Sequence, residues 1–200
     1  MSDGNPVPPC AVIINHEVSD WTRWKMAFDE HEGMRRAAGI LGHHINRGMD
    51  NPNQLSLYLA VSDPEKAKAF AQSDDTRQAM QGAGVTNAPT LAWMTPVSEN
   101  IVWDRELPAF IVTHPVGDFD TWLEGYKAAD AIRRQGGIIG HAVNRSVDDP
   151  NVAIIYHQAE TFGALTAFAG SPDLKAAMQK AGVTGPPQFS FVTGGWAKRY

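Results

Sequence analysis

Hydrophobic and polar positions follow one order along the chain. The run Ala11–His16 is short and rich in β-branched residues, which predicts a strand. After Asp20, large apolar residues recur at helical spacing until Gly39, so a helix is expected there. Two further strand-like runs, Ile40–Arg47 and Leu55–Val61, are separated by turn-forming residues, and this pattern predicts a β-hairpin.

A second helical region and a last strand complete the pattern. Ser62-x-x-Glu65 has the form of a capping box, in which the Ser oxygen and the Glu carboxylate satisfy free amides at a helix start. Ser73 is a candidate N-cap within the same region, which predicts that this helix is divided in two. Gly84 is a typical helix stop, and the run after Pro89 supplies the final strand.

The whole pattern occurs twice. Shifted by 98 residues, Ala11–Val97 aligns with Ala109–Gly195 without a gap, and 32 of the 87 aligned pairs are identical. Two copies are too few for a solenoid, so the sequence predicts duplication of one small domain. The predicted segments are a flexible N-terminal arm (1–9), a first repeat (10–97), a linker (98–108), a second repeat (109–195) and a C-terminal tail (196–200).

Each copy has the element order β-α-β-β-α-β of a ferredoxin-like unit. In this order and in its repetition the chain resembles the dimeric α/β-barrel superfamily, which includes the antibiotic-biosynthesis-monooxygenase-like proteins. The resemblance implies an α+β fold with strand order 4-1-3-2, in which two ferredoxin-like repeats pack sheet to sheet as an intramolecular barrel. It also implies a ligand pocket between the sheet and the helices of each unit.

Composition narrows the classes of partner and location. Seventeen Lys and Arg against 22 Asp and Glu give a formal charge of −5, and no basic run is longer than a pair such as the terminal Lys198-Arg199, so nucleic acid is not expected. No run approaches the roughly 18 apolar residues of a membrane span, and the polar, proline-rich start is not a signal peptide. We therefore expect a cytoplasmic protein without a membrane partner. The single Cys10 excludes an internal disulfide.

Histidines mark the candidate catalytic positions. His16 ends the first strand and His43 begins the second, and His114 and His141 repeat these positions in the second copy. The strand order of the fold predicts that both kinds of position meet at one sheet edge. The third strand adds His157 in the second copy only, where the hairpin is expected to place it opposite His141.

Three uses of these histidines remain open. Imidazole titrates near pH 6.5 and transfers protons around neutrality, which favours general acid–base catalysis. Three imidazoles with an open position also bind transition metals, so a metal in the second repeat is the minority alternative to a site without a cofactor. The third interpretation is structural, with each imidazole satisfied by backbone groups at the sheet edge.

Candidate binding residues repeat beside the histidines. Alternation along a strand places the Asn and the Arg of each Asn-Arg pair on opposite faces, so one polar group of each pair is predicted to be internal. A buried Arg needs a partner, such as Asp20, Asp118 or an anionic ligand. Two tryptophans are predicted in mid-helix, as core residues or as the wall of a pocket. The set is Asn46, Arg47, Tyr58, Trp24, Asn144, Arg145, Tyr156 and Trp122.

The leading functional hypothesis, based on the resemblance and these residues, is a small-molecule enzyme. It would act on a hydrophobic metabolite, in the narrower form an aromatic one, as a monooxygenase-, cyclase- or isomerase-like protein with His acid–base residues at a sheet–helix pocket. The alternative is a non-catalytic small-molecule-binding or stress-associated barrel protein, and a third is a purely structural duplicate. The barrel would be completed within one chain, with a further homo-oligomer left open, as is the identity of the active half.

Overall fold

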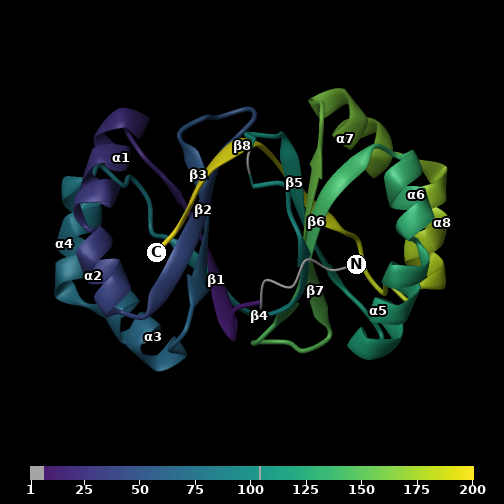
Figure 1. Ribbon diagram of the computed structural model, residues 1–200, viewed down its shortest axis with the longest axis horizontal. Coiled ribbons are helices and arrows are strands. Elements are labelled where there is room, and N and C mark those ends of the chain that lie inside the picture. The colour runs from purple at the N-terminus through teal and green to yellow at the C-terminus, as the bar shows by residue number, and fades with distance from the viewer. Residues whose placement is uncertain (1–6, 104) are drawn as a thin grey trace. The chain divides into compact units, whose positions relative to one another are not determined.

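The computed structural model describes residues 7–103 and 105–200, and its elements follow the predicted order twice (Figure 1). The predicted N-terminal arm falls mostly outside the described residues. The first eight elements are β1 (Cys10–Glu17), α1 (Trp21–Glu30), α2 (Glu32–Ala37), β2 (Ile40–Gly48), β3 (Gln54–Val61), α3 (Pro64–Gln72), α4 (Asp74–Gly82) and β4 (Thr90–Asn100). The second eight are β5 (Ala109–Pro115), α5 (Phe119–Ala128), α6 (Asp130–Gln135), β6 (Ile138–Ser146), β7 (Val152–Ala159), α7 (Phe162–Ala169), α8 (Pro172–Lys180) and β8 (Gln188–Arg199).

The strands form antiparallel neighbours in the predicted order. In the first repeat β1 pairs with β3 and with β4, and β2 pairs with β3, which gives 4-1-3-2. The second repeat has the same order, because β5 pairs with β7 and with β8, and β6 pairs with β7. The α+β class and the ferredoxin-like repeats are therefore confirmed.

Two strands, β4 and β8, are shared between two compact units. The first unit is formed by Pro8–Met94 and Gly195–Tyr200, and the second unit by Thr95–Gly194. β4 and β8 therefore each contribute residues to both units. The expected tail, 196–200, is mostly strand and belongs to the first unit. The packing of the two sheets on each other stays a prediction.

Each unit has its helices on one face of its sheet, with the apolar core between them (Figure 1). In the first unit this core contains Val12, Ile45 and Leu57, and the partly buried Phe28 of α1 packs against it. In the second unit Phe110 and Ile155 from the sheet pack with Leu165 and other helix residues. No helix in the described part of the chain has the length and apolar character needed to cross a bilayer.

Local capping explains where the helices begin. The Asp20 carboxylate accepts a hydrogen bond from the Arg23 amide, and Asp118 does the same at the start of α5. Ser73 caps α4, which confirms the predicted division of the second helical region. Gly39 (φ 79°) ends α2 in the left-handed conformation that favours glycine.

One predicted cap is wrong. Asp63, not Ser62, is the N-cap of α3, and its Oδ1 accepts a hydrogen bond from the Lys66 amide. The Ser62 hydroxyl instead donates to the Gly39 carbonyl at 2.8 Å. The sequence pattern is displaced by one residue because the turn after β3 already uses the Ser62 side chain.

Candidate functional site

The strand registers sort the predicted site residues onto the two faces of each sheet. Directly paired residues on neighbouring strands point the same way, and direction alternates along each strand. The His16 ring lies 5.6 Å from that of Trp24 in α1, which identifies the helix-covered face of the first unit. This face carries His16, His43 and Arg47, or His114, His141, His157 and Arg145 in the second unit; the opposite face carries Asn46, Tyr58, Asn144 and Tyr156.

The histidines do not meet at one sheet edge, which corrects the prediction. His16 pairs with Leu55 at the start of β3, whereas His43 pairs with Leu59 near its end. Four residues along a strand correspond to about 13 Å. The equivalent histidines of the second unit have the same spacing, because β1 and β5 end beside the start of their antiparallel neighbours.

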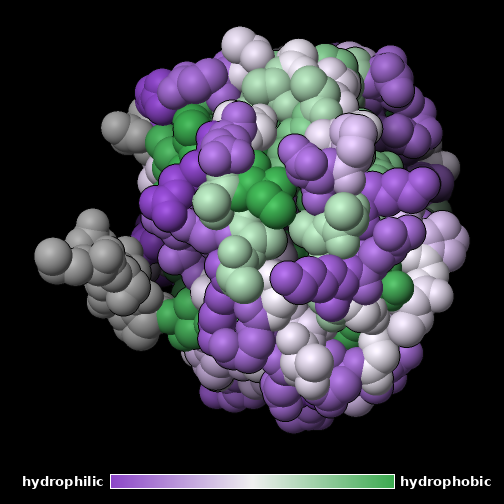
Figure 2. All heavy atoms as spheres, turned by 90° about the vertical axis from the view of Figure 1, so that its right-hand side faces the viewer, coloured by the Kyte–Doolittle hydropathy of each residue, from purple (hydrophilic) through white to green (hydrophobic). Residues whose placement is uncertain are grey.

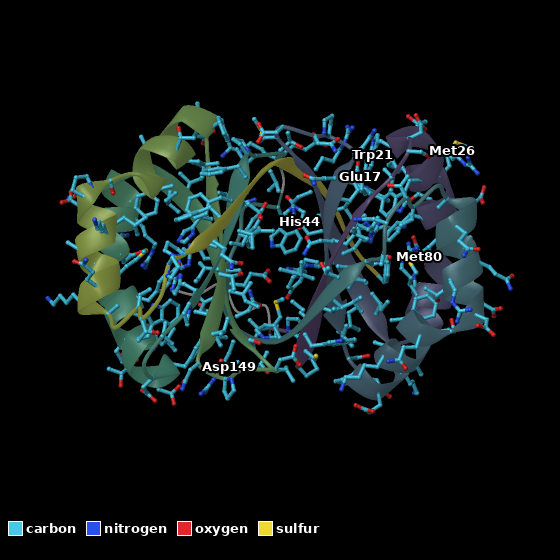
Figure 3. All side chains as sticks on the ribbon, turned by 180° about the vertical axis from the view of Figure 1, so that it is seen from behind. Glu17, Trp21, Met26, His44, Met80 and Asp149 are labelled. Atoms are coloured by element: carbon cyan, nitrogen blue, oxygen red, sulfur yellow. The ribbon has the colours of Figure 1, made fainter. Side chains whose placement is uncertain are left out.

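The first unit contains a cavity of about 110 Å³ between its sheet and its helices. Figure 3 shows Met80 pointing from α4 toward the sheet, where this cavity lies. Trp24 stands between His16 and Phe28, with its ring centroid 4.9 Å from that of Phe28. The lining is almost entirely apolar or aromatic apart from His16, His31, Arg35 and Thr76.

Arg35 is a buried cation in the wall of this cavity. Arg35 is only 4% exposed, and its guanidinium carbon lies 3.4 Å from the centre of the Phe28 ring. Nη1 donates to the Phe28 carbonyl oxygen, and Nε donates to the Tyr200 hydroxyl at 2.8 Å. The remaining nitrogen, Nη2, is buried without a hydrogen-bond partner among the described residues.

Tyr200 connects Arg35 to His43. The Tyr200 hydroxyl lies 2.9 Å from His43 Nδ1, while Nε2 of the same imidazole is buried without a partner in the described structure. Trp196 packs against His43 with ring centroids 4.5 Å apart. Both aromatic residues come from the last part of β8 and its end, so the first unit obtains part of its site from the distant end of the sequence.

Burial determines the charge of the candidate histidines. Removal from water lowers the pKa of His16 to about 4, and neither ring nitrogen has a hydrogen-bond partner among the described residues. Burial and, to a lesser extent, the Arg35 charge lower the pKa of His43 to about 4. Both imidazoles are therefore neutral at pH 7, and proton transfer near neutrality, expected from the ordinary imidazole pKa, does not apply to them.

The second unit has a smaller cavity, of about 50 Å³, in the equivalent place. His114 and Trp122 line it, with ring centroids 5.6 Å apart, and burial lowers the pKa of His114 to about 4. Ala129 and Ala177 belong to its helical wall. Figure 2 faces the helices of this unit and shows apolar residues reaching the surface among polar ones.

A tyrosine hydroxyl joins the two neighbouring histidines of the second unit. His141 and His157 lie directly opposite each other across β6 and β7, as the hairpin predicted. The Tyr126 hydroxyl lies 3.2 Å from His141 Nδ1 and 3.3 Å from His157 Nε2. Burial lowers the pKa of His141 to about 4 and holds that of His157 well below its ordinary value, and it raises the pKa of Tyr126, so all three groups are uncharged at pH 7.

The three histidines do not form the predicted row. His114 pairs with Ala153, four residues along β7 from His157. His141 Nδ1 and His157 Nε2 both contact the Tyr126 hydroxyl. No group of three metal-binding side chains is found in residues 7–103 and 105–200.

In each Asn-Arg pair the internal residue is the Asn, and not the Arg as one interpretation of the sequence assumed. The internal members are Asn46 and Asn144, which are 2% and 4% exposed. Arg47 is half-buried, donates to a turn carbonyl and lies 4.8 Å above the Trp21 ring. Arg145 uses Asp120, at 3.7 Å, rather than Asp118 as its nearest carboxylate.

The opposite face of each sheet holds the remaining predicted binding residues. Tyr156 is buried there among Ala109, Val192 and other apolar residues of its own unit, and burial raises its pKa. Figure 3 shows His44 extending from β2 on the side away from the helices of its own unit. The predicted binding set is therefore divided, and only Trp24 and Trp122 line the two cavities.

Sequence reasoning missed several residues that complete these sites. Arg35 and Arg133 repeat at the shift of 98 residues and follow the aromatic helix stripe, so the repeat carried a signal for them. Tyr126 occupies the place of Phe28 in the other copy and gave no repeated signal. Tyr200 lies outside the aligned segments and was visible only in the structure.

Comparison with known proteins identifies similar structures but no matching sequence family. No family model and no curated protein sequence matches the chain. A protein from Lactobacillus acidophilus proposed to be a monooxygenase has a similar structure, with TM-score 0.64 and 11% identity over 96% of this chain and 99% of that one. One from Fusobacterium nucleatum with the same proposed activity also has TM-score 0.64 and 11% identity, over 98% and 100%.

A third similar structure is that of an anthrone oxidase-like protein, with TM-score 0.66 and 14% identity over 95% of this chain and 92% of that one. The chain thus shares its ferredoxin-like fold with these proteins, as the element order indicated.

Proposed function

We propose that this chain is an enzyme that oxidises a small aromatic substrate bound in the cavity of the first unit. The observation that supports this most is the composition of the cavity wall. Aromatic and aliphatic side chains surround two buried polar groups, His16 and Arg35, whose free nitrogens have no partner among the described residues. Buried polar atoms without partners require an explanation, and a bound ligand supplies one.

The cavity suits a single aromatic ring. Its volume of about 110 Å³ is close to that of a cavity of about 150 Å³ known to accept benzene. The Trp24 and Phe28 rings offer flat apolar surfaces, on which a planar ligand packs well. A substituent oxygen of the ligand would accept a hydrogen bond from Arg35 Nη2, and His16 would hydrogen-bond the same or a second substituent.

The reaction class is proposed from the similar structures, because proteins thought to be monooxygenases and an anthrone oxidase-like protein share this fold. An activated aryl methylene reacts with dioxygen without a reductant: R₂CH₂ + O₂ gives R₂C=O and H₂O. The carbon loses four electrons and dioxygen gains four, and the two hydrogens leave in the water. We therefore propose a reaction without a cofactor, in which His16 orients the substrate, since an imidazole with a pKa of about 4 is a weak base at pH 7.

The test uses two equivalent alanines. Ala79 lines the cavity of the first unit, and Ala177 has the same place in the second. Oxygen uptake would be measured by electrode with single-ring phenols and aryl methylene compounds, together with substrate binding by calorimetry. Ala79→Leu fills the first cavity and is expected to lower uptake and affinity at least tenfold, whereas Ala177→Leu leaves both near wild type.

The alternative function has a distinct result in the same experiment. A compound that binds in an Ala79-dependent way, while no compound of the panel causes oxygen uptake, would support a non-catalytic small-molecule binder. Equal effects of the two alanine variants would contradict the assignment of the site to the first unit.

A further inference from the structure

Arg35 and Arg133 occupy equivalent buried positions in the two repeats, but they differ in their contacts with carboxylates. Arg133 in the second unit donates from Nη2 to the Asp130 carboxylate at 3.3 Å, and it also donates to the Tyr126 carbonyl. Arg35 is equally buried, but no carboxylate of the described residues lies within ion-pair distance of it. A buried cation without a carboxylate in direct contact is unfavourable, because attraction over a longer distance repays less of its desolvation.

The carboxylate equivalent to Asp130 is present in the first unit but is paired elsewhere. Glu32 aligns with Asp130 at the shift of 98 residues, three positions before its arginine. Lys198 Nζ contacts Glu32 Oε2 at 2.5 Å, and Arg36 lies 3.6 Å from the other oxygen. Glu32 is therefore in direct contact with Lys198 and Arg36 and attracts Arg35 only over a longer distance, whereas Asp130 contacts Arg133 directly.

We propose that the first cavity binds its aromatic ligand as an anion, with the charged oxygen on Arg35 Nη2. This deepens the proposed function and rests on it. Nη2 is the buried guanidinium nitrogen without a partner among the described residues, and Arg35 belongs to the cavity wall. A guanidinium binds carboxylate and phenolate oxygens through charge-assisted hydrogen bonds, which are stronger than neutral ones. The ligand class is a single aromatic ring bearing a phenolate, enolate or carboxylate oxygen.

The experiment compares the two protonation states of one probe. The phenolate of 4-nitrophenol absorbs visible light and its neutral phenol does not, so the pKa of the bound probe is read by titrating the absorbance in the presence of excess protein. Each pKa unit of lowering corresponds to tenfold tighter binding of the anion. We expect the wild-type chain to lower the probe pKa by at least about one unit.

Charge variants separate Arg35 from its surroundings. Arg35→Gln is expected to abolish the lowering, and Arg133→Gln, the matched change in the second unit, to leave it intact. Lys198→Gln frees Glu32 to pair with Arg35 and should reduce the lowering several-fold without altering the cavity wall. The double variant Lys198→Gln/Glu32→Gln removes the released carboxylate and should restore the lowering, which keeps the test decisive if Arg35→Gln does not fold.

The outcomes distinguish the two proposals. A probe that binds in an Ala79-dependent way with an unchanged pKa would overturn the anion preference and leave the proposed cavity in place. An unchanged shift in Lys198→Gln would contradict the role assigned to Glu32 and with it the missing counter-charge. If neither the phenol nor the phenolate form of the probe binds, the result would count against the proposed aromatic site itself.

Discussion

Burial determines the protonation state of the histidines in this protein, and this limits the chemistry of each side chain. His16, His43, His114 and His141 all have a pKa of about 4 because their rings are removed from water. A neutral imidazole donates one hydrogen bond and accepts one. These side chains are therefore suited to orienting a ligand or a hydroxyl at pH 7, and much less to carrying a proton.

A stability measurement tests this at one residue. The pKa of His114 is lowered on folding, so the unfolded state binds a proton that the folded state does not. Stability from this group is present above pH 6.5 and is lost as the pH falls from 6.5 toward 4. Between pH 7 and pH 5 the loss is about 2 kcal/mol for one such histidine.

His114→Leu removes this contribution. The decrease in unfolding free energy between pH 7 and pH 5, measured by urea denaturation, is expected to be about 2 kcal/mol smaller in the variant than in the wild type. Carboxylates titrate equally in both proteins and cancel in the comparison. An identical decrease in the two proteins would show that His114 is protonated normally in the folded chain.

Part of the cavity lining follows from the sequence, but the connections between its residues do not. His16 and Trp24 were predicted as site residues and do line a cavity together. The positions of His16 and His43 at opposite ends of their sheet depend on antiparallel register, which pairs residues far apart in the chain. The Tyr126 bridge depends on two differences between the copies, Tyr126 in place of Phe28 and His157 in place of Leu59, and no local pattern marks the first of them.

At the level of elements, helix starts depend on single side chains that satisfy free backbone amides. The carboxylate of Asp63 caps α3, while the neighbouring Ser62 hydroxyl closes the turn onto Gly39. Loss of an N-cap costs about 1 kcal/mol. Asp63→Ala is thus expected to lower the unfolding free energy by about this amount, and Ser62→Ala by less.

Thermal and urea unfolding of the two alanine variants would measure the difference. Asp20→Ala, which removes the N-cap of α1, provides a reference for the size of a cap effect in this fold. A larger loss for Ser62→Ala than for Asp63→Ala would indicate that the capping box of the sequence pattern forms after all.

The element order and the strand order are the parts of the fold that the sequence predicts best. Most helices and strands have their own local pattern, and the copies support each other because most of these signals occur twice. The divided first helix was not foreseen: the chain leaves α1 at His31 without a breaking residue, and the ring nitrogen of His31 contacts the Ala27 carbonyl. Ser73, by contrast, carries a recognisable cap and was predicted.

In the whole molecule, the end of β8 supports a site built mainly from the other repeat. Gly195–Tyr200 belong to the first unit, and the Tyr200 amide donates to the Leu41 carbonyl at 2.8 Å. Removal of these six residues is expected to expose β2 and α2 and to weaken binding of 4-nitrophenol. The effect should appear in the first repeat, although the deletion lies next to the second.

Hydrogen–deuterium exchange of the shortened chain measures this effect segment by segment. Faster exchange is expected in β2 and α2, while β5 and β7 keep their protection and act as an internal reference. Faster exchange confined to residues 109–194 would contradict the assignment of the last six residues to the first unit.

The shared strands also determine where genes of this type can be recombined. A chimera joined at residue 97, where the sequence repeat ends, would give the first unit Trp196 and Tyr200 from a foreign parent and so mismatch its ligand site. Crossovers after Met94 and after Gly194 instead keep each set of contacts from one parent. Shuffled libraries built with these junctions should therefore retain more correctly folded members than libraries cut at the visible repeat boundary.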